Sequence, residues 1–266
     1  MRLRLSLPQG QHRTRWLTAL IGLPLLAASI WAGGVFLFAV ILLVSLVGLW
    51  EFFGLFPGVS PVMRPLGLVL GAAMVWLGFR FGVAAALSVP LFAFWLEELA
   101  WLGPAKNTPG RFILPVSLLY VPASLQFTLH LSPGEVALVF AAVMATDTGA
   151  YYAGHLIGGP KIWPSVSPKK TWAGSLGGLV ATVAVCLVVA ALWGKASLAL
   201  FALLGVALSV ASQLGDFMES ACKRAAGAKD SGRLLPGHGG VLDRIDGLLP
   251  AILIYALART WVSFLH

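Results

Sequence analysis

The sequence predicts an all-α, polytopic integral membrane protein with about nine transmembrane helices and a cytoplasmic N-terminus. Of its 266 residues, 59% are hydrophobic and only 11% are charged, and the mean hydropathy is +0.89. Soluble domains carry roughly 25% charged residues, so this composition excludes an ordinary soluble domain. Long apolar runs, and an uneven distribution of Lys and Arg between them, support the same class.

The apolar runs approach the length of about 20 residues that a helix needs to cross a bilayer. Four arginines, Arg2, Arg4, Arg13 and Arg15, precede the first run without a clear signal-peptide cleavage site, which predicts an uncleaved first span. Arg80 separates two short runs that predict a tight hairpin or a re-entrant segment. The predicted spans are residues 16–32, 34–56, 65–79, 81–97, 112–130, 134–157, 172–193, 196–221 and 241–263.

The positive charges test this topology. With the N-terminus inside, the five predicted cytoplasmic segments contain 4, 1, 2, 3 and 5 Lys or Arg residues, 15 of the 18 in the chain. This skew follows the positive-inside rule, so the net charge of +8 first reflects topology. No nucleic-acid partner is expected, because the basic residues are scattered over loops. The predicted inner segments are residues 1–15, 57–64, 98–111, 158–171 and 222–244.

Two regions are expected along the chain. Residues 1–130 predict transmembrane helices for packing, lipid contact and a candidate dimer interface, and residues 131–266 predict a catalytic region with a cytoplasm-facing polar site. Glu51, in Leu-Trp-Glu-Phe-Phe, is interpreted as an interfacial anchor among aromatic residues. The two cysteines, Cys186 and Cys222, predict neither a disulfide nor a CxxC metal site.

The densest group of charged residues lies at 216–246, between two apolar segments. Asp216, Glu219, Ser220, Lys223 and Arg224 recur at intervals of three and four residues, so they share one face of a helix.

The same block continues through Pro-Gly-His-Gly-Gly at 236–240 to Asp243 and Asp246, which share a face of the next helix. Glycines let the backbone approach a ligand closely. Carboxylate oxygens suit Mg²⁺, and Lys and Arg suit phosphate oxygens. The block therefore predicts a metal–phosphate site; the regular spacing argues against a plain solvated loop.

A second polar group begins with Asp147, about two-thirds along the sixth predicted span. An acid at membrane depth is a functional hypothesis by default, and a packing hydrogen bond to Thr146 or Tyr152 is the alternative. Farther on, Ser-Val-Ser-Pro-Lys-Lys-Thr-Trp at 165–172 predicts an anion site at a helix N-terminus that Thr171 caps. A plain positively charged loop is the alternative there.

These motifs resemble a known family. The pattern S-x-x-K-R-x(4)-K-D-x(5)-P-G-H-G-G-x-x-D-R-x-D, from Ser220 to Asp246, is similar to the signature of the phosphatidate cytidylyltransferases (CDP-diacylglycerol synthases). Asp-Thr-Gly-Ala-Tyr and Ser-Pro-Lys-Lys-Thr-Trp resemble a second motif of that family, although many members have Glu or Gln in place of Ala173. The resemblance covers roughly residues 140–250.

The resemblance implies transfer of CMP from CTP to phosphatidate with release of pyrophosphate. It implies Mg²⁺, allows a second cation such as K⁺, and suggests a homodimer surrounded by membrane lipids. Because the loops are short and no processing signal is evident, we expect a bacterial inner membrane with the active site facing the cytoplasm.

The roles expected of individual residues follow from this interpretation. Asp216, Asp243 and Asp246 are predicted metal ligands, and Ser220 and Lys223 are predicted to contact metal-bound phosphate. These five are the predicted catalytic residues. The predicted substrate-binding residues are Asp147, Ser167, Lys169, Lys170, Arg224, Lys229, His238 and Arg244.

Other functions also fit parts of the pattern. A CTP-dependent polyprenol or phytol kinase would instead move the γ-phosphoryl group to a lipid alcohol, but the complete signature favours the cytidylyltransferase. A transporter would need an ion path across the bilayer, whereas these acids crowd at one face and no inverted repeat is evident. The CDP-alcohol phosphotransferases carry a D-G-x-x-A-R run that is absent here.

Overall fold

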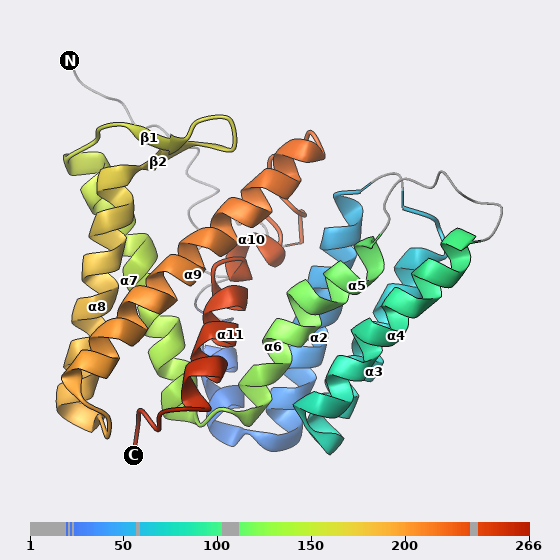
Figure 1. Cartoon of the computed structure of the whole chain (residues 1–266), viewed down its shortest axis with the longest axis horizontal. Coiled ribbons are helices and arrows are strands. Elements are labelled where there is room, and N and C mark those ends of the chain that lie inside the picture. Colours follow the sequence, from blue (N-terminus) through green and yellow to red (C-terminus); the bar gives the residue numbers. More distant parts are fainter. Residues whose placement is uncertain (1–19, 21, 23, 57–58, 103–111, 235–238) are drawn as a thin grey trace.

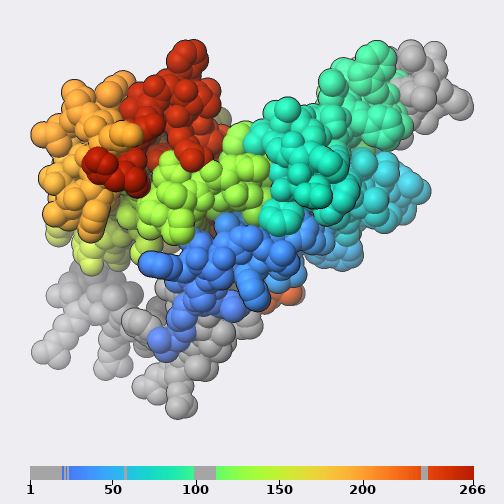
Figure 2. Space-filling model, turned by 90° about the horizontal axis from the view of Figure 1, so that it is seen from below, coloured from blue at the N-terminus to red at the C-terminus, as the bar shows by residue number. Residues whose placement is uncertain are grey.

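The computed structural model describes residues 20, 22, 24–56, 59–102, 112–234 and 239–266. Its helices extend between the two ends of one bundle (Figure 1). One end, uppermost in Figure 1, carries a two-stranded hairpin and the C-terminal end of α9. The other end, seen in Figure 2, carries the last residues of the chain beside α9.

The N-terminal region is built from helices throughout. Residues 24–32 are helical, and α2 (Gly34–Gly54), α3 (Met63–Phe81) and α4 (Val83–Leu102) follow. The next segment is a succession of short pieces instead of one helix. It comprises α5 (Ile113–Leu118), the π-helical η1 (Leu119–Ala123), α6 (Ser124–Gln126) and the 3₁₀-helical η2 (Phe127–His130).

The C-terminal region contains the longest helices. It comprises α7 (Pro133–Leu156), strands β1 (Lys161–Trp163) and β2 (Ser167–Thr171), α8 (Trp172–Trp193), α9 (Leu198–Ala225), α10 (Leu242–Ile245) and α11 (Leu248–Arg259). The strands pair antiparallel, with Lys161 opposite Thr171 and Trp163 opposite Ser167. An all-α fold with one small hairpin is thus confirmed.

Six helical segments in the described residues are long and apolar enough to cross a membrane: residues 34–54, 63–81, 113–130, 133–156, 172–193 and 198–225. The fourth predicted segment is present as helix α4, separated from α3 at Gly82, but it is not among these six, and its crossing of the membrane stays a prediction. The first, at 16–32, lies partly outside the described residues. The chain is a polytopic membrane protein, and the count of nine spans stays a prediction.

Two predicted spans differ from the structure in a way that sequence chemistry explains. The 113–130 segment is irregular around Pro115 and Pro122, since proline lacks an N–H and crowds the preceding turn. A single span over 241–263 is wrong, because the helix is interrupted at Asp246–Gly247 and α11 is only 12 residues long. Such a helix measures about 18 Å.

The helices that flank the polar residues pack closely. Ser132 and Glu135 form a capping box at the start of α7, and Thr171 caps α8 by accepting a hydrogen bond from the Gly174 N–H at 3.0 Å, as predicted. A Cβ on Gly177 of α8 would lie 2.9 Å from the Gly149 carbonyl oxygen of α7. Only glycine permits this approach, which is typical of helix contacts in membranes.

Candidate active site

A polar pocket of about 440 Å³ opens between α7, the hairpin, α8 and α9. It combines the two sequence groups, because Asp147 from α7, Lys169 and Lys170 from β2, and Asp216 from α9 all line it. We call it the α7–α9 pocket. Its other lining residues are Thr146, Ala150, Tyr151, Gly154, His155, Lys161, Ile162, Thr171, Gly174, Ser175 and Gln213.

Lys170 and Asp216 form an ion pair across the α7–α9 pocket. The Lys170 Nζ lies 2.6 Å from Asp216 Oδ2 and 4.5 Å from the centroid of the Phe217 ring. The two side chains are 30% and 23% exposed, so water and ligands can reach both. Because the pair is partly solvated, the Lys170 ammonium could leave the Asp216 carboxylate and bind a phosphate oxygen instead.

Hydrogen bonds connect two lining residues of the same pocket, Ser175 and Gln213. The Ser175 hydroxyl of α8 donates to Gln213 Oε1 of α9, and Gln213 Nε2 donates to the Ser175 carbonyl at 3.3 Å and to Ser209 Oγ at 3.1 Å. Gln213 lies one turn before Asp216 on α9. The helix that carries the carboxylate is therefore tied to α8 at the level of the pocket.

The Thr146 hydroxyl is also committed to packing. It lies 2.6 Å from the Thr182 hydroxyl and 3.0 Å from the Ala142 carbonyl oxygen. Asp147, next to it, is exposed and lines the pocket. The alternative of a packing bond between Asp147 and Thr146 is thus not supported, and substrate contact by Asp147 stays a prediction.

A second group of charges lies farther along α9. The Lys223 ammonium binds Glu219 on the same helix and Asp243 Oδ1 of α10, the latter at 2.6 Å. The side chains of Lys223, Glu219 and Asp243 are 12%, 1% and 6% exposed. One buried cation therefore joins two helices through two buried carboxylates.

Asp243 also accepts hydrogen bonds from the backbone. The Ser231 N–H lies 3.0 Å from Oδ2 and 3.2 Å from Oδ1, and the Gly240 N–H lies 2.8 Å from Oδ2. Burial alone would raise the pKa of Asp243, but the bonds from Lys223 and Gly240 outweigh it and hold the pKa below its ordinary value. Asp243 is thus an ionised carboxylate that organises the chain around it.

Asp246 experiences the opposite balance. It lies between α10 and α11, outside the helices long enough to span. Burial, followed by repulsion from Asp216 and Glu219, raises the pKa of Asp246 to about 9. Moreover, Glu219 Oε1 is buried with no hydrogen-bond partner among the described residues. Asp246 therefore keeps its proton at neutral pH, because a third charge beside Asp216 and Glu219 is unfavourable in this poorly solvated place.

Such a donor set fits a divalent cation in its chemistry. Oxygen ligands from Asp216 and Asp246 suit Mg²⁺, and a bound cation would relieve the repulsion that raises the pKa of Asp246. In the arrangement described, however, no three His, Cys, Asp or Glu side chains surround a common point within the described residues. Lys170 and Lys223 hold Asp216 and Asp243 instead. The metal roles of Asp216, Asp243 and Asp246 stay predictions.

The remaining predicted site residues are placed as follows. Ser167 begins β2 and pairs with Trp163, and Ser220 is half-buried on α9. Arg224 is exposed and donates to the Ala228 carbonyl at 3.1 Å, while Lys229 and Arg244 are also exposed. His238 lies outside the described residues. None of these roles is tested by the structure.

Sequence reasoning missed several residues that the structure brings to the site. Tyr151, His155, Lys161, Ser175 and Gln213 line the α7–α9 pocket. A polar residue inside an apolar run, such as Gln213, is the sequence signal that could have identified some of them.

The interfacial interpretation of Glu51 is wrong. Its side chain is buried, at 5% exposure, and its carboxylate binds the backbone at residues 241 and 242. The local sequence around Glu51 is the same whether the side chain lies at the membrane interface or is buried against a distant segment, so it could not distinguish the two.

The fold and the site together define a class: a polytopic membrane protein whose helix bundle holds a pocket lined by lysines and carboxylates. The chain belongs to the cytidylyltransferase family. The model described as Cytidylyltransferase family matches residues 13–261, nearly the whole sequence.

Curated relatives agree with this assignment. A protein of Brucella suis named phosphatidate cytidylyltransferase is 43% identical over 185 residues, which cover 67% of this chain and 63% of that protein. Proteins of the same name from Mycobacterium tuberculosis and Staphylococcus saprophyticus are 36% and 32% identical. The match covers 69% of this chain and 62% of the mycobacterial protein, and 89% of this chain and 95% of the staphylococcal one. The chain thus spans less than two thirds of the Brucella relative.

The buried cation Lys223 gives a prediction for stability. Lys223→Met should destabilise the protein by about 3–5 kcal/mol, because it leaves the buried carboxylates of Glu219 and Asp243 without their shared partner. Thermal unfolding in detergent would measure this as a lower Tm. Lys195→Met, at an exposed position between α8 and α9, should change stability by no more than about 0.5 kcal/mol. Equal Tm values for the two variants would contradict the structural importance of the cluster.

Proposed function

We propose that this protein transfers CMP from CTP to phosphatidate, giving CDP-diacylglycerol and pyrophosphate. The observation that carries the proposal is the α7–α9 pocket, in which Lys170 pairs with Asp216 and Lys169 also lines the wall, within an apolar helix bundle. Lysines bind phosphate oxygens, and carboxylates hold the cations that accompany nucleotides. The names of the relatives supply the substrates.

The reaction needs charge neutralisation more than proton transfer. A phosphate oxygen of phosphatidate attacks the α-phosphorus of CTP; the new P–O bond forms there as the bond to the β-phosphate oxygen breaks and pyrophosphate leaves. Because the attacking oxygen is already ionised, no general base is required. The principal barrier is to align two anions, and fixed cations lower it.

The chain supplies that alignment from residues on rigid elements. Lys169 and Lys170 lie on β2, which leads into α8, and the Lys170 ammonium reaches Asp216 from this paired strand. On nucleotide binding, Lys170 exchanges Asp216 for a phosphate oxygen and leaves that carboxylate free. Asp216 and Asp246 would then hold Mg²⁺, which when bound neutralises phosphate charge and orients the leaving group.

The aromatic wall of the pocket suits a nucleobase. The Tyr151 and His155 rings lie within 3° of parallel, with centroids 6.2 Å apart, and both line the pocket at the end of α7. We place the cytosine ring against Tyr151, with the phosphates directed towards Lys170.

The same proposal includes location and assembly. The hairpin and the end of α9, both rich in basic residues, lie at one end of the bundle (Figure 1), and we infer that this end faces the cytoplasm of a bacterial inner membrane. A homodimer and surrounding lipids complete the proposed assembly. K⁺ is a candidate for a second cation.

A product assay tests the function. Purified protein in detergent would receive phosphatidate, Mg²⁺ and CTP labelled separately at the α- and γ-phosphates. Entry of the α-label into lipid, with γ-label released as pyrophosphate, supports the cytidylyltransferase. Transfer of the γ-label to an added lipid alcohol would instead identify a lipid kinase, and ion flux in proteoliposomes without CTP would identify a transporter.

Asp216→Asn tests the metal assignment. The change keeps the size of the side chain but removes the charge that would hold Mg²⁺, so kcat/KM should fall by about 100-fold or more. Initial rates over a Mg²⁺ titration would measure it, and an unchanged melting profile would show that the variant folds. Full Mg²⁺-dependent turnover in Asp216→Asn would remove this residue from the metal site.

Tyr151→Ala tests the position of the nucleobase. Loss of stacking should raise KM for CTP by about 10-fold, and KM for phosphatidate should stay constant. Tyr152→Ala is the control: Tyr152 is similarly exposed, at 59% against 68%, and does not line the pocket, although its ring contacts that of Tyr151 with centroids 5.4 Å apart. Equal KM values for CTP in the two variants would refute this placement.

A further inference from the structure

Glu51 is a buried carboxylate in the N-terminal region that the proposed reaction does not use. It belongs to α2, where it is flanked by Trp50 and Phe52, and its side chain is 5% exposed. Within the described residues Glu51 forms no ion pair, and its carboxylate accepts hydrogen bonds instead. Burying a carboxylate is costly unless such bonds are good, and the position of these bonds therefore indicates what the residue does.

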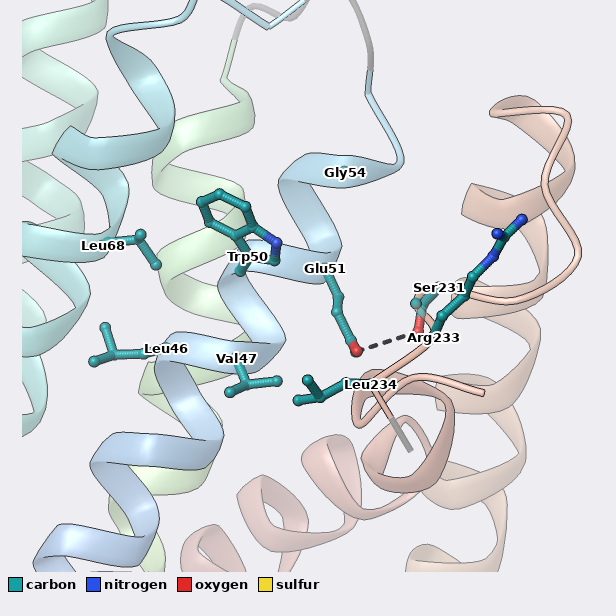
Figure 3. Close-up of a pocket in the computed structure, with 10 residues that line it drawn as sticks. Leu46, Val47, Trp50, Glu51, Gly54, Leu68, Ser231, Arg233 and Leu234 are labelled. Atoms are coloured by element: carbon teal, nitrogen blue, oxygen red, sulfur yellow. Dashed lines mark hydrogen bonds between the residues drawn. The ribbon is translucent and has the colours of Figure 1, made fainter. Parts of the chain in front are cut away.

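The partners of Glu51 all lie in the stretch that leads to the acidic cluster. Oε1 accepts from the Val241 N–H at 3.1 Å, and Oε2 accepts from the Leu242 N–H at 2.8 Å and from the Ser231 hydroxyl at 3.4 Å. Figure 3 shows the Glu51 side chain directed from α2 towards Ser231. Leu242 immediately precedes Asp243.

Glu51 and Asp243 both bind the chain at Ser231 and at residues 240–242. Asp243 binds the N–H groups of Ser231 and Gly240, and Glu51 binds the Ser231 hydroxyl and the next two N–H groups, at 241 and 242. Three consecutive backbone donors, 240 to 242, are thus shared between two carboxylates. Hydrogen bonds from backbone N–H groups to carboxylates are roughly twice as strong as those between neutral groups.

The close approach depends on two glycines. A Cβ on Gly240 would lie 2.6 Å from Glu51 Oε2, and a Cβ on Gly232 would collide with Glu51 Oε1. Any other residue at these positions would therefore push the carboxylate away from its donors. Gly232 and Gly240 are thus the positions at which the backbone packs directly against the Glu51 carboxylate.

An apolar cavity adjoins Glu51 between α2 and the 231–234 stretch. The cavity has a volume of about 580 Å³ and is lined mainly by α2 and the 231–234 stretch (Figure 3). Trp50 and Leu68 lie on its far side from Ser231 in Figure 3. The bond from the Ser231 hydroxyl to Glu51 crosses directly from this stretch to α2, while α10, with the buried Leu242, packs against α2.

We propose that Glu51 is a positioning residue for the transfer reaction. It holds the stretches 231–234 and 239–242 so that Asp243, and through it Lys223, keep the geometry that the acidic cluster requires. Glu51 acts through the backbone and does not touch the reacting atoms. The proposal rests on the proposed function for its effect on rate, but not for its effect on the chain.

The test compares Glu51→Gln with Glu97→Gln. Glutamine has nearly the same shape but no charge, and only one of its two terminal atoms accepts hydrogen bonds. Glu97 is a matched control: it is buried at 7% exposure in the same N-terminal region and accepts the Leu114 N–H at 3.0 Å, away from the site. The Tm of each variant, measured in parallel, separates a loss of stability from a loss of kcat.

Glu51→Gln alone should lower kcat, by about 10- to 100-fold, and leave KM for CTP and for phosphatidate within about 3-fold. Glu51→Asp, which restores the charge on a shorter side chain, should recover part of kcat. Hydrogen exchange followed by mass spectrometry should show faster exchange over residues 239–242 in Glu51→Gln and not in Glu97→Gln.

The readouts separate two kinds of failure. If kcat falls equally in both Gln variants, or if exchange over 239–242 is unchanged in Glu51→Gln, the positioning role is refuted. If the wild-type protein forms no CDP-lipid, the proposed function fails instead, and the exchange experiment still decides whether Glu51 holds this part of the chain.

Discussion

The arrangement of the site depends on a positive charge buried between two helices. The Lys223 ammonium binds both Glu219 of α9 and Asp243 of α10, and all three side chains are nearly inaccessible to water. Because desolvating charges is costly, such a group persists only where each member has partners of the correct sign and geometry. The backbone donors at 231 and 240 supply the additional partners of Asp243. The placement of α10 against α9 follows from this requirement.

The acidic residues thereby separate into two kinds. Asp243 is saturated with hydrogen bonds and remains ionised, whereas burial, followed by the charges of Asp216 and Glu219, raises the pKa of Asp246. The first kind builds the site, and the second is available to a cation. Two aspartates three residues apart, which look equivalent in the sequence, therefore have opposite electrostatic environments.

Local sequence patterns predicted the helix faces and caps of the site. Contacts between residues far apart in the sequence could not be predicted in this way. The periodic spacing from Asp216 to Lys223 correctly predicted one helix face, and the Thr171 cap could be derived from residue type. The contacts of Glu51 connect residues 180 to 191 positions apart, so no local pattern reveals them. The break before α11 was missed because the apolar run at 248–258 was extended backwards through Asp243, Arg244 and Asp246 to make one span.

One remaining feature lies at the opposite end of the bundle. Arg259, the last residue of α11, binds Glu135 of α7 at 2.8 Å, and the Tyr255 hydroxyl donates to the same carboxylate at 3.2 Å. Asp246 lies just before the other end of α11, about 18 Å away. The helix is thus a lever anchored at its far end, and a tilt of only about 3° would shift Asp246 by about 1 Å, twice the tolerance of roughly 0.5 Å within which a working site must be held.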